Sequence, residues 1–146
     1  MRRLSLPLAV VMLAALPATA LADVRFRGKS AQGRLATLRT ADTGLVERFG
    51  IRWAANCARP RFIFLSSTKH LPPYDGSTPA RFVDADGYRD RLANGSRAVF
   101  HSRVVGNRVS ARRWRGTFRV RVRVFRGSRL VDRCFLRTRW RVLLRG

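Results

Sequence analysis

The chain contains 146 residues, of which 31 are Lys or Arg and only 8 are Asp or Glu, so its formal net charge is +23. A field this one-sided draws polyanions and repels other copies of the same chain. The length suffices for one domain with a hydrophobic core, and the two cysteines exclude a zinc site because no histidine lies at ligand spacing from either.

The N-terminus is typical of a secretory signal peptide. Two arginines precede a short apolar run, and small residues follow it up to Ala22. We expect residues 1–22 to be the signal peptide and residues 23–146 to form a single β domain. A membrane span needs roughly 20 unbroken apolar residues, and two prolines interrupt this run. We therefore expect no transmembrane segment and a secreted or envelope-associated protein.

Alternation of apolar and polar residues with a period of two predicts strands along the rest of the chain. In chain order we expect them at residues 24–28, 34–40, 45–57, 61–65, 81–84, 88–91, 97–105, 114–124 and 130–144. The prolines and glycine of residues 66–80 predict a long loop, and Asn94-Gly95 and Gly106-Asn107 predict turns. The fold class is all-β, an antiparallel sandwich or flattened barrel of about eight strands.

The last two strands carry the clearest pattern. Apolar residues at even positions predict a buried face, and the odd positions predict an outer face lined by arginines. These outward residues are Arg119, Arg121 and Arg123 on one strand and Arg133, Arg137 and Arg139 on the other. Opposed residues of an antiparallel pair share one side of the sheet. The hairpin between the two strands should therefore have a loop of odd length, with three residues around Gly127.

Cys57 and Cys134 are the only cysteines, and both fall on the core-facing positions of their strands. In an exported chain two cysteines most simply form a disulfide. Because the loop it closes is long, the chain-entropy argument gives it about 4 kcal/mol of stabilisation. Direct antiparallel pairing of the two cysteines would set Arg52 opposite Arg139, so we expect the disulfide to join strands of different sheets.

A set of short motifs spans most of the chain after residue 22. It comprises Phe26-Arg27-Gly28, Gln32-Gly33-Arg34, Gly44-Leu45-Val46, the run from Ile51 to Cys57, Phe82, Gly87-Tyr88, Gly116-Thr117-Phe118, Cys134 and Trp140. In these motifs the chain resembles a group of uncharacterised small secreted single-disulfide β domains common in high-GC actinobacteria. The resemblance implies an antiparallel sandwich or barrel with one disulfide, and it implies no catalytic residue.

The outward arginines admit two interpretations. Alternate strand residues lie about 6.5–7 Å apart, similar to phosphates along an extended strand, and opposed like charges destabilise a sheet unless an anion offsets them. The alternative is a solvated face whose arginine stems shield apolar surface. We expect a non-catalytic exported domain that binds anionic polymers (cell-wall polymer, nucleic acid backbone or anionic lipid). Too few aromatic residues accompany the arginines for sequence-specific recognition of nucleic acid.

Two other functions stay open. In a structural or protein-binding envelope domain of unknown ligand, the charge would be incidental. A small secreted hydrolase or nuclease could use His70, in the predicted loop, or His101, with Glu47 or Asp84 as the carboxylate. Glu47, the only glutamate, falls on a core-facing position, and we expect it at the exposed end of its strand.

The run Asp84-Ala85-Asp86-Gly87 resembles part of a calcium loop. The full loop needs oxygen ligands at alternate positions and a closing glutamate, and residues 82 and 93 supply neither. We therefore expect Asp84, Asp86 and Asp90 to form turns and to pair with nearby arginines. We expect no catalytic residue, no metal and no cofactor, and the oligomeric state is not predicted.

Overall fold

The computed structural model describes residues 23–146, so the expected signal peptide lies outside the described residues. Nine strands account for most of this segment. They are β1 (Val24–Ser30), β2 (Leu35–Thr40), β3 (Val46–Cys57), β4 (Ile63–His70), β5 (Gly76–Thr78), β6 (Arg81–Arg91), β7 (Arg97–Ser110), β8 (Arg113–Arg126) and β9 (Arg129–Leu144). The prediction of an all-β antiparallel fold is confirmed. The expected strands at 81–84 and 88–91 are one strand, β6, and β5 lies within the segment that was expected to be a loop.

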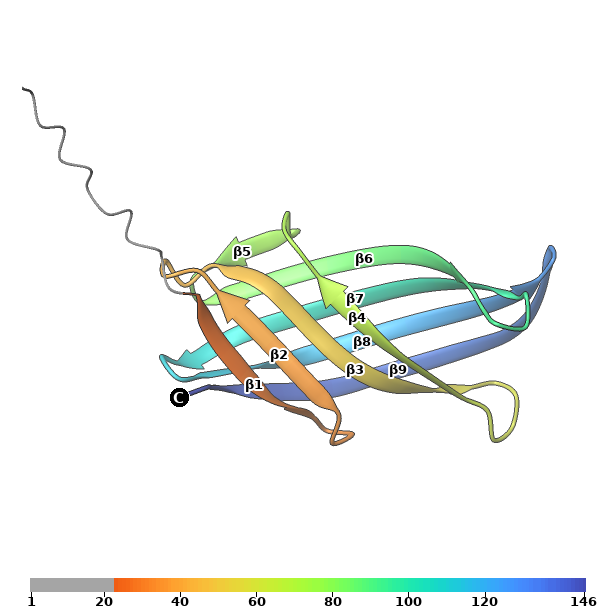
Figure 1. The fold of residues 1–146 in the computed structure, drawn as a ribbon, viewed down its shortest axis with the longest axis horizontal. Coiled ribbons are helices and arrows are strands. Elements are labelled where there is room, and N and C mark those ends of the chain that lie inside the picture. Colours follow the sequence, from red (N-terminus) through yellow and green to blue (C-terminus); the bar gives the residue numbers. More distant parts are fainter. Residues whose placement is uncertain (1–22) are drawn as a thin grey trace, which may run out of the picture.

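All nine strands belong to one sheet, in the order β4-β3-β2-β1-β9-β8-β7-β6-β5. The long strand β9 lies between the half formed by β1–β4 and the half formed by β5–β8. Its C-terminal part pairs with β1, and its Cys134 and Phe135 pair with the end of β3. The sheet thus folds over and partly closes, and β1–β4 cross in front of the longer strands β6–β9 (Figure 1). Each residue therefore faces either the space between the two halves or the solvent.

The core between the two halves is formed by the inward positions of the alternating strands. In β8 the predicted inward side chains Trp114, Phe118, Val120, Val122 and Val124 are all buried. The largest fully buried aromatic side chains come from β3, β6, β7 and β8, and they are Phe49, Trp53, Phe82, Phe100, Trp114 and Phe118. Large aromatic rings thus fill much of the core, and aliphatic side chains fill the rest.

Gly106 lies in the middle of β7, directly opposite Gly116 of β8. Phe82 and Trp140 flank this pair on the neighbouring strands, and their ring centroids are 6.2 Å apart. A Cβ at Gly106 would lie 2.1 Å from Cε1 of Phe82, and a Cβ at Gly116 would lie 2.6 Å from Cζ2 of Trp140. The predicted turn at Gly106-Asn107 is therefore wrong, because the glycine makes room for an aromatic ring inside a strand.

Two other predicted interruptions are also continuous strands. β4 extends to His70, so the expected long loop shrinks to residues 71–75 before the short strand β5. β6 runs without a break through Asp86, whose Oδ1 accepts a hydrogen bond from the next backbone N–H at 2.7 Å. Asp90 makes the same local contact at 2.8 Å. Neither aspartate forms a turn, because β6 pairs with β7 residue by residue from Arg81 to Arg91.

In the β8–β9 hairpin the arginines lie on the predicted outer face, but a bulge produces this arrangement instead of a three-residue loop. The turn has two residues, and Arg126 pairs with Arg129 across it. The predicted three-residue loop is therefore wrong. The extra residue is Val131, which has no partner because Phe125 pairs with Leu130 and the next pair joins Val124 to Asp132. A bulge of this kind shifts the register by one residue, so the arginines beyond it still point outward.

The disulfide between Cys57 and Cys134 is confirmed, with a sequence separation of 77 residues. Its expected place between different sheets is wrong, because the two cysteines lie directly opposite each other in paired strands. This pairing continues only to the next residue pair, and Arg52 lies opposite Ser67 of β4. The anticipated clash with Arg139 does not arise, because β1 and β2 separate the rest of β3 from β9.

Glu47 lies at the start of β3, as expected, and its side chain is partly exposed. A bulge leaves it without a partner residue in β2, and its side chain is 35% exposed. Its Oε2 lies 3.1 Å from Nε of Arg39, whose other guanidinium nitrogen Nη1 lies 3.1 Å from Oδ2 of Asp23. One arginine therefore pairs with two of the few acidic residues.

Candidate anion-binding surface

Exposed arginines cover the outer faces of β7, β8 and β9, and we call this group the arginine surface. It comprises Arg103, Arg119, Arg121, Arg123, Arg133, Arg137 and Arg139, all of them exposed. The alternation that buries Phe118, Val120 and Val122 turns the intervening residues of β8 outward. The six arginines predicted from the sequence all lie on this one face.

The strand register sets these arginines directly against one another. Arg103, Arg119 and Arg137 form one row across three adjacent strands. Further along, Arg123 opposes Arg133. Neighbouring strands lie about 4.8 Å apart, and alternate residues of a strand lie about 6.8 Å apart. The predicted adjacency of the two arginine rows is confirmed, and together with Arg103 they form a two-dimensional grid of positive charge.

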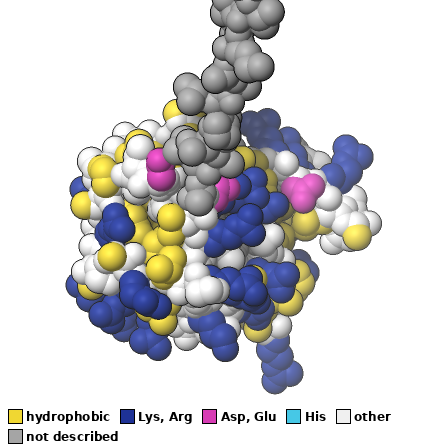
Figure 2. Space-filling model, turned by 60° about the vertical axis from the view of Figure 1, so that its left-hand side comes forward, with side chains coloured by type: hydrophobic (Ala, Val, Ile, Leu, Met, Phe, Trp, Pro, Cys, Tyr) yellow, Lys and Arg dark blue, Asp and Glu magenta, His cyan; other side chains and the backbone are white. Residues whose placement is uncertain are grey.

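No carboxylate within residues 23–146 forms an ion pair with the arginine surface. Within this range, the ion pairs are those of Arg39 with Asp23 and Glu47, together with the His70–Asp84 contact. Basic side chains also predominate elsewhere, as Figure 2 shows for one side of the molecule. Because directly opposed like charges destabilise a sheet, an anion bound at the arginine surface would relieve a repulsion that the protein itself leaves in place.

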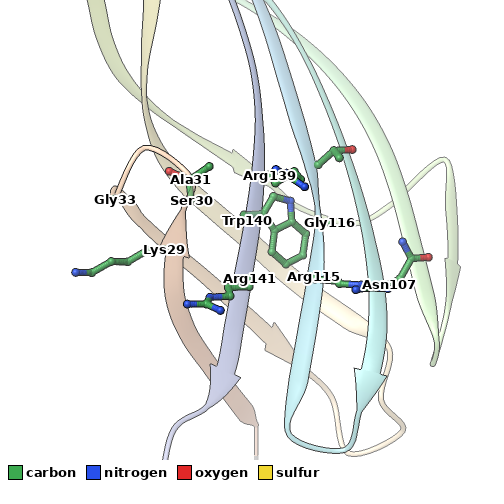
Figure 3. A pocket seen from close by; sticks show the side chains of 11 residues that line it. Lys29, Ser30, Ala31, Gly33, Asn107, Arg115, Gly116, Arg139, Trp140 and Arg141 are labelled. Atoms are coloured by element: carbon green, nitrogen blue, oxygen red, sulfur yellow. The ribbon is translucent and has the colours of Figure 1, made fainter.

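A basic cleft of about 810 Å³ adjoins this surface where β1 ends beside β9. Its cationic lining residues are Lys29, Arg115, Arg139 and Arg141. Figure 3 shows Lys29 to one side of β9 and Arg115 to the other. The backbone N–H of Ala31 donates to the carbonyl oxygen of Arg139 at 2.8 Å, which holds the turn after β1 against β9. Arg139 thus belongs to both the cleft and the arginine surface.

A buried hydrogen-bond network connects β4 with β6 and β7. Nδ1 of His70 lies 2.5 Å from Oδ2 of Asp84, and its Nε2 lies 3.2 Å from Oγ of Ser102. The three residues are 0%, 6% and 4% exposed, respectively, so Oγ of Ser102 is kept from solvent. β4 is the strand at one end of the sheet order, and β6 is the second strand from the other end. The network therefore links two strands that lie far apart in the sheet order. Its burial supports a structural role.

This network corrects two predictions. His70 ends a strand and does not lie in a loop, and Asp84 occupies an inward position of the continuous strand β6 and so does not form a turn. His101 lies on the outer face, where its Nε2 is 3.5 Å from a terminal guanidinium nitrogen of Arg123. One histidine faces the core and the other faces solvent, so the two do not converge on one cleft.

Tyr74 packs against the same network from the loop after β4. Its hydroxyl donates to the carbonyl oxygen of His70 at 3.2 Å. Burial, followed by the negative charges of Asp84 and Glu47, raises the pKa of the Tyr74 phenol above its ordinary value. The hydroxyl therefore stays protonated well beyond neutral pH and keeps its role as a donor.

The one group of side chains in residues 23–146 whose ligand atoms lie close enough to hold a metal is Cys57, Asp132 and Cys134. The two sulfurs are joined in the disulfide. Oδ1 of Asp132 accepts hydrogen bonds from the backbone N–H groups of Arg59 and Arg133, at 3.3 and 2.8 Å. The Asp132 carboxylate therefore holds the backbone near the disulfide in place. The sulfurs of Cys57 and Cys134 are bonded to each other and are not thiolates that could bind a metal.

The site residues predicted from the sequence do not include Arg103, Arg115, Arg141 or Lys29. Arg103 could have been found, because it alternates with buried residues in a strand that a short turn connects to β8. Arg115 and Arg141 share the outward positions of the arginines that were predicted. Lys29 comes from β1, which pairs with β9 across more than a hundred residues of chain, and no local pattern indicates that pairing.

The fold and this surface define a disulfide-bonded all-β protein with an arginine-covered outer face. Comparisons with protein families, curated proteins and solved structures found no match. No helix within the described residues is long and apolar enough to cross a membrane. The disulfide is of the kind that persists in oxidising, extracytoplasmic compartments.

Proposed function

We propose that this protein is an exported, non-catalytic domain that binds anionic polymers or anionic surfaces through the arginine surface. The observation that carries the proposal is the row of Arg103, Arg119 and Arg137, three directly opposed arginines without an acidic partner among the described residues. A row like this is costly in the free protein, and a ligand with closely spaced negative charges offsets the cost.

The chemistry of the surface favours phosphate or carboxylate groups over bases. Guanidinium groups form paired hydrogen bonds with both kinds of anion. Among the described residues, one aromatic side chain within the arginine surface is half-exposed, that of Phe135, which lies opposite Arg121. Proteins that read single strands interleave several aromatic side chains for stacking on bases. The proposal is therefore contact with a charged backbone or headgroup, without sequence-specific recognition of nucleic acid.

The test is a salt titration of binding to inorganic polyphosphate and to single-stranded DNA. The oxidised protein is compared with a variant that carries Arg119→Ser, Arg121→Ser and Arg123→Ser. Each ionic contact contributes to the dependence of the logarithm of affinity on the logarithm of salt concentration. We expect the slope for the variant to be shallower by about one unit per lost arginine.

A matched control removes the same charge elsewhere. Arg25→Ser, Arg48→Ser and Arg52→Ser change exposed arginines of β1 and β3, and we expect this variant to retain most of the wild-type slope. Equal slopes for the wild type and the Arg119, Arg121 and Arg123 variant would show that the contact lies elsewhere. If the wild type binds neither polyanion at physiological salt, the structural or protein-binding alternative takes precedence.

A further inference from the structure

Exposed apolar side chains lie next to the arginine surface on the same outer face. Phe62, Ile63, Leu65 and Phe135 are 46%, 55%, 62% and 50% exposed, and we call them the apolar patch. Ile63 and Leu65 occupy the outward positions of β4, whereas Phe64 between them is buried. Large exposed apolar side chains gathered on one face are a common feature of interaction sites.

The β3–β9 pairing brings the patch and the arginines together. Ile63 pairs with Asn56, Asn56 with Phe135, Phe135 with Arg121, and Arg121 with His101. Paired residues share one side of a sheet, and all five are exposed. Across five strands, the outer face thus changes from apolar at β4 to basic at β8. The distance along this row is about 20 Å at the usual strand spacing.

The β3–β4 loop adds charge beside the patch. Residues 58–62 are all exposed, and they include Arg61, which directly precedes Phe62, and Arg59. This loop and the β8–β9 hairpin lie at the same end of the molecule (Figure 1). The hairpin places Arg126 and Arg129 at that end as well. Basic side chains therefore lie beside the apolar patch at this end of the molecule as well.

We infer that the anionic partner is the surface of a lipid bilayer, an inference that rests on the proposed function and specifies its ligand. A bilayer with acidic headgroups offers phosphates to the arginines and an apolar interior to Phe135, Ile63 and Leu65. A soluble polyanion neutralises the arginines but leaves the apolar patch in water. A second copy of the chain could cover the patch, but it brings the same large excess of positive charge.

The two parts of the surface fit the usual requirement for firm attachment. A single weak membrane signal gives marginal, reversible binding, and stable peripheral attachment combines an apolar insertion with a basic patch. Arginines near an anionic membrane each add a modest attraction that falls off within a Debye length. Binding should therefore require both acidic lipid and the apolar patch.

The experiment measures partitioning of the oxidised protein onto vesicles, with inorganic polyphosphate as a soluble comparison. The vesicles contain either phosphatidylcholine alone or phosphatidylcholine mixed with phosphatidylglycerol. One variant carries Ile63→Ser, Leu65→Ser and Phe135→Ser. The control for location is Leu143→Ser, which removes one apolar side chain, 55% exposed, at the opposite end of β9. Circular dichroism and the disulfide content confirm that the variants are folded.

We expect the wild type to bind the mixed vesicles and not phosphatidylcholine alone. The apolar-patch variant should lose about tenfold or more of its partition coefficient, because it forgoes the burial of three apolar side chains, and it should bind polyphosphate as the wild type does. Leu143→Ser should match the wild type in both assays. A Phe135→Trp reporter should show a blue-shifted emission on mixed vesicles and not on polyphosphate.

Two outcomes overturn the inference and leave the proposed function standing. One is binding of polyphosphate without binding of mixed vesicles. The other is equal vesicle binding by the wild type and the apolar-patch variant. If the wild type binds neither polyphosphate nor vesicles, both the inference and the proposed function fail. Loss of self-association in the apolar-patch variant, with unchanged vesicle binding, would assign the patch to a second copy of the chain.

Discussion

At the scale of single residues, the tightest packing of the core is found around Gly106 and Gly116. Gly116 of β8 pairs with Gly106 of the adjacent strand β7. The rings of Phe82 and Trp140 occupy the space that side chains at these two positions would need. A Cβ at Gly116 would lie 1.9 Å from the carbonyl oxygen of Val105, which is backbone and cannot turn away. The close approach of these strands therefore depends on a single missing methyl group.

Gly116→Ala should destabilise the protein by about 2 kcal/mol or more, because overpacking forces side chains and backbone to shift. Urea unfolding of the oxidised protein measures the change. Gly76→Ala serves as the control, since no atom lies within 4 Å of a Cβ built there and its φ is not positive. Similar losses in both variants would show that the crowding around Gly116 is not the cause.

The buried phenol of Tyr74 predicts a dependence of stability on alkaline pH. Folding raises the pKa of Tyr74 above the value of about 10 that tyrosine has in an unfolded chain. Folding therefore favours the protonated phenol, and its contribution is fully present below pH 10 and is lost as the pH rises further.

We expect the free energy of unfolding to fall above pH 10 in the wild type and to fall less in Tyr74→Phe. Urea unfolding at a series of pH values between neutral and strongly alkaline measures this slope. The variant loses the hydrogen bond to His70, so it should also be less stable at neutral pH. Parallel curves for the two proteins would contradict the role assigned to burial of the phenol.

Among the elements, β4 depends on side chains for its contact with the opposite half of the sheet. It pairs only with β3, and His70 at its end contacts Asp84 of β6 and Ser102 of β7. Asp84→Ala would leave a buried imidazole without its carboxylate partner. We expect a loss of about 3 kcal/mol in the free energy of unfolding, because unpaired buried polar groups keep their full desolvation cost.

The matched control for this prediction is Asp86→Ala on the same strand. Asp86 is exposed, and its carboxylate accepts a hydrogen bond only from the next backbone N–H, so the loss of this side chain should cost less than about 1 kcal/mol. Urea unfolding of both variants measures the difference. If the two variants lose the same stability, the His70–Asp84 contact does not hold β4 against β6.

At the scale of the whole molecule, the excess of basic residues opposes folding. A net charge of this size destabilises the compact state through self-repulsion, and salt screens it. We expect the thermal midpoint to rise by several degrees between low and physiological ionic strength, as calorimetry or circular dichroism would record. At equal ionic strength, sulfate should stabilise more than chloride if anions bind the arginine surface.

The comparison variant is again Arg119→Ser, Arg121→Ser and Arg123→Ser, which relieves part of the repulsion. Its midpoint should respond less to salt and should lose most of the difference between sulfate and chloride. A midpoint that is independent of salt in the wild type would mean that the arginines are already neutralised within the protein, contrary to the ion pairs of the structure.

The sequence by itself determined the strands, the outward direction of the arginines and the identity of the disulfide. These properties are local, because side chains alternate with a period of two and only two cysteines are present. Asp84 and Gly106 were misread, because each carries a turn signal that strand pairing and aromatic packing override. Sequence patterns could identify a strand but could not show what packs on it.

Only the tertiary structure decided which strands lie side by side. The pairing of Asn56 with Phe135 places Ile63 beside the arginine surface, and the folding over of the sheet buries His70 against Asp84. Contacts of this kind join residues far apart in the chain, and they depend on how the two halves of the sheet pack around the shared aromatic core. Alternation within one strand carries no information about that packing, because it specifies a face and not a neighbour.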